Sequence, residues 1–243
     1  LSISERGDIK PLKLSLPDGG SVVIEGKVDR VDVMGSGGKS YVRVIDYKTG
    51  SKKFKLADVI YGLNMQMLFY LAAIDKNGQS RYGNIVPSGI LYMPAVRPYV
   101  KLENKENKED FERKIYEKTR MNGLILGNME VIRGMENEAG GLFIPVSVKD
   151  GIINGDESFV NSQQMQIIMR YAESMAVQMG ENLHSGKISI DPIRNENIKS
   201  CDWCPYGAVC CREDEDCFEI SNKSSKAELI QEMQKKLGDK NIE

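Results

Sequence analysis

Long apolar runs are absent from this sequence. A helix that crosses a bilayer needs about 18 or more consecutive apolar residues, and no stretch of the 243 residues approaches that length. A secretory signal at the start of the chain is also missing. We therefore expect a cytoplasmic protein. Because the chain begins at Leu1 and enters strand-like residues at once, we also expect a piece of a longer protein.

An excess of charge of either sign is absent too. The 33 basic and 35 acidic side chains leave a net charge of −2, which argues against a protein that coats nucleic acid by bulk electrostatic attraction. A nucleic-acid contact would have to be local. The segment KTGSKKFK at 48–55 is the basic cluster that could make one.

Histidine is nearly absent, and a nucleotide-binding P-loop is missing. The only histidine, His184, lies at the end of an expected helix, where we interpret it as structural rather than catalytic. GSGGKS at 35–40 lacks the full G-x-x-x-x-G-K-[ST] pattern and a following helix. We interpret its glycines as a hairpin turn.

The expected elements define a mixed α/β domain with a central sheet. PDGG and GSGG punctuate residues 11–50, which predicts three strands joined by glycine-rich turns. The apolar period changes to that of a helix over 56–74, and a further strand is expected over 88–96. We then expect a long helix that ends at Gly186, and either a terminal helix or a frayed tail over 224–243.

Two charged residues interrupt an apolar strand in YVRVIDYKTG, residues 41–50. Side chains on a strand alternate between faces, so Asp46 and Lys48 follow Val42 and Val44 on one face. A carboxylate and an ammonium beside an apolar stripe are costly unless they pair or bind something. One interpretation is a surface salt bridge at the strand end, and the other is a functional site.

A second carboxylate falls on the preceding strand, expected over 22–33. Asp29 shares its face with valines of that strand, whereas Asp32 and Glu25 are expected in solvent. The valines are Val23, Val31 and Val33. If this strand pairs antiparallel with 41–48, Asp29 lies near the aspartate and lysine described above. Two carboxylates at one place repel each other, and a divalent cation such as Mg²⁺, with waters and substrate phosphates, removes that repulsion.

These residues match a known nuclease pattern. GKVDR, with Asp29, and IDYK, with Asp46 and Lys48, resemble the core of the PD-(D/E)XK nucleases in the form found in RecB-type exonucleases. QMLFY matches the Gln-x-x-x-Tyr motif of that branch with Gln66 and Tyr70, which lie four apart on one helix face. The resemblance implies that this pair positions substrate. On periodicity alone it would be a polar pair bridging helix and sheet.

The resemblance implies metal-assisted hydrolysis of a phosphodiester bond. Asp29, Asp46 and the backbone carbonyl of Tyr47 would hold Mg²⁺ or Mn²⁺, and Lys48 would assist the attacking water. A further acidic residue or histidine would come from an upstream helix. The lysines that would contact phosphates of a single strand are Lys52, Lys53 and Lys55.

Five cysteines lie within CDWCPYGAVCCREDEDC, and none precedes them. Such clustering argues for a soft-metal site over disulfides. Cys201, Cys204 and Cys210 form C-x2-C-x5-C, one ligand short of a zinc site or a four-cysteine iron–sulfur cluster. Cys211 and Cys217 could complete a zinc site. The spacing resembles iron–sulfur nucleases, which implies a [4Fe-4S] cluster whose fourth cysteine lies upstream in the full-length protein.

Further stretches extend the resemblance to AddB-type nuclease domains, over about residues 10–218. PSGILYMPAV and MNGLILGNMEVIRGM are two of them. The implied fold is a restriction-endonuclease-like α/β core, with a central mixed sheet flanked by helices and a C-terminal cysteine-rich metal clasp at 201–217. We expect the nuclease domain to span 1–220 and a tail, helical or not, to span 221–243.

The resemblance also implies a function and partners. It indicates a metal-dependent DNA exonuclease domain in one component of an ATP-dependent helicase/nuclease that processes double-strand breaks for recombinational repair. Single-stranded DNA from the helicase would be the substrate, and an AddA-type helicase/nuclease subunit would be the partner. The alternatives are a non-catalytic DNA-binding or structural module of the same complex, a zinc-stabilised interaction domain, and a Cas4-like iron–sulfur exonuclease, which would not be expected to carry the segment 100–160.

Overall fold

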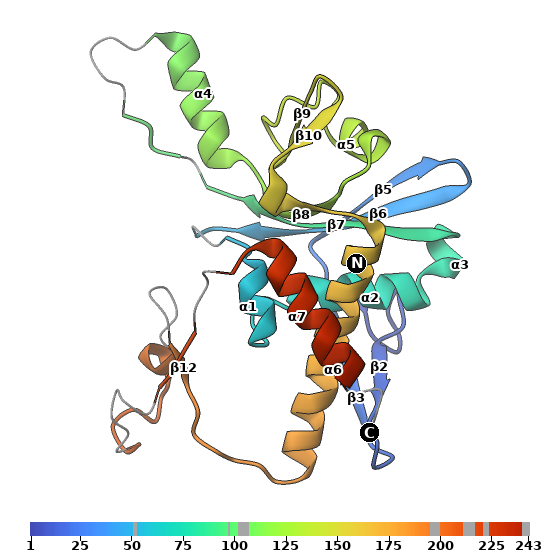
Figure 1. Ribbon diagram of the computed structural model, residues 1–243, viewed down its shortest axis with the longest axis vertical. Coiled ribbons are helices and arrows are strands. Elements are labelled where there is room, and N and C mark those ends of the chain that lie inside the picture. The colour runs from blue at the N-terminus through green and yellow to red at the C-terminus, as the bar shows by residue number, and fades with distance from the viewer. Residues whose placement is uncertain are drawn as a thin grey trace.

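The computed structural model shows a mixed α/β domain around a five-stranded sheet (Figure 1). It describes residues 1–50, 53–96, 98–101, 107–194, 200–210, 217–220 and 224–239. Lys52 and Cys211, which the sequence singled out, lie outside the described residues.

The central sheet has the strand order β11-β8-β7-β6-β5. Its strands are β5 (Arg30–Ser36), β6 (Lys39–Lys48), β7 (Ile85–Pro94), β8 (Asn122–Leu126) and β11 (Phe159–Val160). Strands β6 and β7 run parallel, β5 is antiparallel to β6, and β8 is antiparallel to β7 and parallel to β11. Parallel neighbours need a crossover connection, which helices α1 (Leu56–Ile60) and α2 (Gln66–Asn77) supply.

Smaller strand pairs and the other helices surround this sheet. The two-stranded pairs are β1 (Ser2–Ile3) with β4 (Gly26–Lys27), β2 (Leu12–Ser15) with β3 (Ser21–Ile24), β9 (Ser147–Lys149) with β10 (Ile152–Asn154), and β12 (Ile193–Arg194) with β13 (Phe218–Glu219). The other helices are α3 (Gln79–Tyr82), α4 (Lys108–Thr119), α5 (Met129–Met135), α6 (Ser162–His184) and α7 (Lys226–Asp239), with 3-10 turns η1 (Asp156–Ser158) and η2 (Ser200–Trp203).

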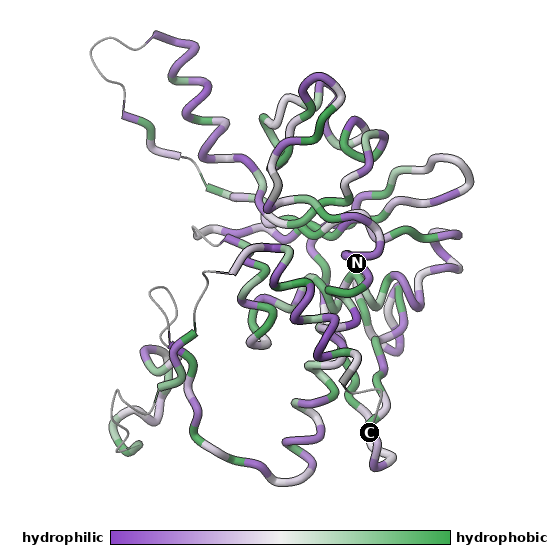
Figure 2. Tube along the Cα trace, viewed as in Figure 1, coloured by the Kyte–Doolittle hydropathy of each residue, from purple (hydrophilic) through white to green (hydrophobic). Residues whose placement is uncertain are grey.

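Each face of the sheet carries its own core. Val44 of β6 packs in the larger core with α1, α2, α6 and α7, and its neighbour Ile45 packs in the smaller core with α5 and the residues around β9. Figure 1 shows the first set of helices on one side of the sheet and α4, α5, β9 and β10 on the other. Because both faces are covered, the fully buried residues of the central strands are apolar on both sides, and green stretches run through the sheet in Figure 2.

The strand expected over 22–33 is broken into three, which corrects one prediction. Residues 21–24 pair with β2, residues 26–27 pair with β1, and only β5 joins the central sheet. Val23 therefore does not share a sheet face with Asp29, and its side chain is half exposed. The break falls immediately before the pairing with β6 begins at Arg30.

The single helix expected over 56–74 is also wrong. The chain leaves the helix after Ile60 and resumes at Gln66. Gly62 and Asn64 have positive φ angles of 76° and 56°, a conformation that ends a right-handed helix. The apolar spacing continues through this break, so the pattern does not reveal it.

The other expected elements are present. The PDGG and GSGG turns join β2 to β3 and β5 to β6. Strand β7 corresponds to the strand expected over 88–96, but it begins three residues earlier and ends two residues earlier. Helix α6 ends before Gly186, whose φ is 73°, and α7 begins after Ser225, which exchanges hydrogen bonds with Glu228. None of the described helices has the length and apolar character that a membrane crossing requires.

Candidate active site

Asp46 and Lys48 lie at the C-terminal end of strand β6 and form an ion pair with each other. Their side chains are 18% and 25% exposed. They follow Val42 and Val44, both fully buried, on the face that packs against α2. The prediction that this face is apolar at its root and ionic at its tip is confirmed.

Asp29 is the residue immediately before β5, and its side chain reaches the same end of β6. The β5–β6 ladder ends at the pair Arg30 and Ile45, which leaves Asp29 one residue beyond it. Its Oδ2 accepts a hydrogen bond of 3.1 Å from the backbone nitrogen of Tyr47. The structure thus places the Asp29 carboxylate beside the residue that separates Asp46 from Lys48.

The chain diverges here because Val28 has another partner. Val28 donates to the carbonyl of Leu1 (2.8 Å) and accepts from the Leu1 nitrogen (3.0 Å). The Asp29 side chain takes the place that Val28 would have had opposite Tyr47 in a continued ladder. The N–H and C=O of one strand residue point to the same edge, so the Tyr47 carbonyl is directed to the edge where Asp29 lies.

A buried tyrosine underlies the ion pair, and no pattern in the sequence indicated it. The Lys48 ammonium lies 5.3 Å from the centroid of the Tyr92 ring, within cation–π range. Tyr92 is Asp46's register partner on β7. Its burial and the nearby carboxylates of Asp46 and Asp58 raise the pKa of Tyr92 to about 12, since all three effects oppose a phenolate.

Asp58 is the second residue that sequence reasoning missed. It is buried on α1, where its Oδ2 accepts a 2.6 Å hydrogen bond from the Asn64 amide. A charged residue within LADVI, whose other side chains are apolar and buried, was the available signal. Asp58 adds negative charge near Tyr92, and hence near the ionic end of β6.

Gln66 and Tyr70 lie on the first turns of α2 and contact each other, and Tyr70 also contacts the segment before Asp29. The Gln66 amide donates a 3.2 Å hydrogen bond to the Tyr70 hydroxyl. The Tyr70 ring packs on Gly26 of β4 so closely that a Cβ there would lie 2.8 Å from the ring Cζ. Tyr70 therefore lies against the segment that leads into Asp29.

Asp32 was expected to be exposed to solvent, but its side chain is half-buried and is paired with two arginines. Arg43 donates to it at 2.6 Å and Arg30 at 2.7 Å. Burial opposes ionisation of Asp32, but these hydrogen bonds and charges outweigh it and hold the pKa of this carboxyl below its usual range. This cluster lies nearer the hairpin turn than Asp46 does and is separate from the ionic strand end. His184 likewise pairs elsewhere, with Asp18.

The described cysteines do not form a ligand set. Cys201 lies in η2, and its carbonyl accepts from the Cys204 nitrogen at 3.1 Å. Cys204 is exposed, and Cys210 and Cys217 are half-buried. Within the ranges given above, no three cysteine, histidine or acidic side chains lie together as a metal site. These thiols alone do not fit a four-ligand cluster, and no step of the chemistry below depends on one.

The ionic end of β6 does fit a hard divalent cation. Two carboxylates and one backbone carbonyl supply the oxygen ligands that Mg²⁺ prefers, and waters and phosphate oxygens usually complete such a site. The Asp46 Oδ2 atom is buried and, apart from its ion pair with Lys48, accepts no hydrogen bond from the described residues. A buried carboxylate oxygen without a hydrogen-bond donor is unusual, and such an oxygen is available to a metal ion.

The fold and this strand end together define the class of protein. Residues 3–211 match the family model described as the PD-(D/E)XK nuclease superfamily. The chain belongs to this superfamily, which confirms the expected family and its α/β core with a central mixed sheet.

Relatives narrow the class further, and all three named here are B-type subunits of an ATP-dependent helicase/deoxyribonuclease. The chain is 35% identical over 225 residues to the protein of Thermoanaerobacter sp. strain X514, covering 91% of this chain and 19% of that protein. It is 37% identical over 215 residues to the protein of Clostridium botulinum strain Hall, covering 86% and 19%. The match to the protein of Caldanaerobacter subterraneus is 32% over 240 residues, covering 98% and 20%. The chain spans about a fifth of the length of these relatives.

Proposed function

We propose that this chain is the metal-dependent DNA nuclease domain of an AddB-type protein, acting as an exonuclease within an ATP-dependent helicase/nuclease that prepares double-strand breaks for recombinational repair. The observation that carries the proposal is the hydrogen bond from Tyr47 to Asp29, which brings a second carboxylate to the Asp46–Lys48 pair. The family match and the names of the relatives support it. A structural module has no physical need for two carboxylates at one strand end.

Each residue has a distinct part in the proposed reaction. Asp29, Asp46 and the Tyr47 carbonyl would hold Mg²⁺ or Mn²⁺, which when bound polarises the phosphate and lowers the pKa of its water. Lys48 would orient the attacking water and stabilise the charge that develops on the phosphate oxygens. Its ammonium is kept in place by Asp46 and by the Tyr92 ring.

The remaining residues would have supporting parts. Gln66 and Tyr70 would position the substrate strand, and Lys53 and Lys55 would contact its phosphates. A [4Fe-4S] cluster held by Cys201, Cys204 and Cys210 is proposed only together with an upstream cysteine. Its role would be to clasp the domain. An AddA-type helicase/nuclease subunit is the proposed partner.

The test is Mg²⁺-dependent cleavage of end-labelled single-stranded DNA. It compares the chain with its Asp46→Ala variant, and Glu25→Gln serves as a matched control because Glu25 is an exposed carboxylate outside the site. We expect cleavage that Asp46→Ala abolishes, that Glu25→Gln leaves unchanged, and that a metal chelator stops. If the chain, both alone and within the complete protein, binds DNA but does not cut it with Mg²⁺ or Mn²⁺, the structural-module alternative replaces the nuclease proposal.

A further inference from the structure

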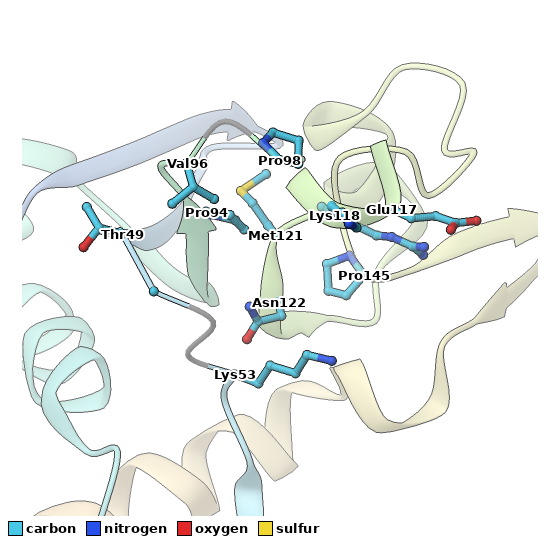
Figure 3. Close-up of a pocket in the computed structure, with 12 residues that line it drawn as sticks. Thr49, Lys53, Pro94, Val96, Pro98, Glu117, Lys118, Met121, Asn122 and Pro145 are labelled. Carbon is cyan, nitrogen blue, oxygen red and sulfur yellow. The ribbon is translucent and has the colours of Figure 1, made fainter. Parts of the chain in front are cut away.

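A pocket of about 640 Å³ opens beside the ionic end of β6 (Figure 3). Thr49, the residue after Lys48, lines it, and so does Pro94, which pairs with Lys48 in the β6–β7 register. The other walls come from the loop after β6, the segment before α4, the end of α4 and the start of β8. The pocket therefore begins one residue from the proposed catalytic lysine. We call it the α4 groove.

Two hydrogen bonds fix the walls of the α4 groove. The backbone nitrogen of Phe54 donates to the Asn122 side chain at 2.7 Å, which holds Lys53 against β8. On the other wall, the Lys118 ammonium donates to the carbonyl of Tyr99 at 2.6 Å, which holds the end of α4 to the segment before it. The groove is thus formed before any ligand enters.

The charges that line the α4 groove favour an anion. Lys53, Lys118 and Arg120 line it together with a single acidic residue, Glu117. Neither the Lys53 ammonium nor the Arg120 guanidinium forms an ion pair with a residue of the described ranges. Since the charges of the whole chain nearly balance, this local excess is the kind of contact that a phosphate backbone would use.

An exposed aromatic residue, Tyr99, follows Pro98 in the segment that forms one wall of the α4 groove. Tyr99 is 83% exposed, although its neighbour Pro98 lines the groove and its own carbonyl is bound by Lys118. No packing requirement explains a ring left in water at this place. Helix α4 is also hydrophilic (Figure 2) and has no buried residue, so it contributes little to the core. A nucleic-acid base stacks well on such a ring, whatever the base.

We infer that the α4 groove holds the single DNA strand next to the catalytic end of β6. Lys53 and Arg120 contact successive phosphates, Lys118 supports the rim, and Tyr99 stacks on a base. Phosphate contacts combined with one stacking ring grip a strand without reading its sequence. This inference rests on the proposed function, because the groove would lead the strand to the proposed nuclease centre at the end of β6.

The first test measures DNA binding without cleavage. Fluorescence anisotropy of a fluorescein-labelled oligothymidylate is followed with the intact chain in EDTA at several salt concentrations. Lys53→Gln and Arg120→Gln should each weaken binding about five-fold near 0.1 M salt and reduce the salt slope by about 0.7. Lys13→Gln is the matched control, because Lys13 is exposed on β2, outside the groove. Its affinity and slope should equal those of the parent chain.

The second test isolates the stacking ring. Tyr99→Ala should weaken binding at least about five-fold and leave the salt slope unchanged. Tyr99→Phe should restore the affinity, since it keeps the ring. An oligonucleotide with abasic sites should bind the parent and the Tyr99→Ala variant equally, because it offers no base to stack.

Each outcome decides between the two proposals. A parent chain that does not bind the strand at low salt, or groove variants that bind as the parent does, would overturn the groove. Because binding is measured without divalent cation, a chain that grips DNA through these residues yet never cuts it would contradict only the nuclease proposal. A chain that cuts normally with all groove variants would contradict only the groove.

Discussion

Replacing Asp29 by asparagine removes a negative charge from the candidate site and keeps the hydrogen bond that the side chain makes, so it tests the charge without changing the fold. The new amide oxygen can still accept the hydrogen bond from the Tyr47 nitrogen, which is 3.1 Å long in the parent. Asp29 is exposed, so the change requires no repacking. We expect the free energy of unfolding to change by less than about 1 kcal/mol.

The same replacement should strongly weaken divalent-cation binding. A carboxylate and a divalent cation whose charge centres are about 3 Å apart attract each other by about 3 kcal/mol at the screening of water. Water-like screening is appropriate because Asp29 is exposed. The loss corresponds to about 100-fold in affinity, and partial burial beside Asp46 would increase it.

Mn²⁺ binding to the chain without DNA is the direct assay, followed by electron paramagnetic resonance or calorimetry alongside thermal unfolding. Glu25→Gln is the control, since Glu25 is also an exposed carboxylate that accepts one backbone hydrogen bond, from Glu5 at 3.4 Å. If Asp29→Asn binds Mn²⁺ as tightly as Glu25→Gln does, Asp29 is not a ligand. If instead Asp29→Asn unfolds the chain, the fold depends on the charge of this carboxylate, and the separation of fold from function is wrong.

Three further changes test the surroundings of the site. The pKa of Tyr92 is raised to about 12, so its contribution to folding stability is complete below the ordinary value near 10, and about 3 kcal/mol is lost as pH rises through 12. Denaturant unfolding of Tyr92→Phe should therefore depend less steeply on pH over this range than unfolding of the parent does. Identical pH profiles for the two proteins would refute the role of burial. Gly26→Ala should lower the free energy of unfolding by about 1–3 kcal/mol, because the new Cβ collides with the Tyr70 ring. The double variant with Tyr70→Ala should lose less stability than the two single variants lose together. Strict additivity of the three losses in thermal unfolding would contradict this. Since the pKa of Asp32 is held low, its stabilising effect is present above the usual value near 4 and lost as pH falls below it. Asp32→Asn should therefore flatten the pH dependence of acid unfolding, followed by circular dichroism, and an unchanged profile would contradict this.

The parts of the fold that local signals specify were predictable. PDGG and GSGG mark two hairpins because glycine adopts the turn conformations freely, and the long periodic pattern of α6 marks a helix. The breaks in the other two elements were not predictable from pattern. Asn64 ends α1 by turning back to bond Asp58, and Val28 leaves the line of β5 because Leu1 pairs with it. Both causes lie outside the apolar period on which the predictions relied.

The candidate site was visible in the sequence for a related reason. A charge within an apolar strand costs free energy wherever it lacks a partner, so Asp46 and Lys48 stand out, and Asp29 follows from the pairing of neighbouring strands. Tyr92 does not stand out, because a tyrosine is ordinary in a buried strand. The α4 groove does not either, since its walls come from segments that only the tertiary structure brings together.

The position of the charges at the end of β6 follows from how the sheet is covered. Val44 and Ile45 are both fully excluded from solvent, on opposite faces, so a charge in the middle of this strand loses water and needs a partner, which Arg43 has in Asp32. At the end of the strand the α2 side remains partly open, and there Asp46 and Lys48 keep 18% and 25% of their side-chain surface. That much burial strengthens their field, and that much exposure admits a metal ion, water and phosphate. In the middle of β6, Arg43 is neutralised by Asp32. At the end of the strand, the buried Oδ2 of Asp46 has only Lys48 as a partner among the described residues, so we expect a metal ion there rather than in the middle of the strand.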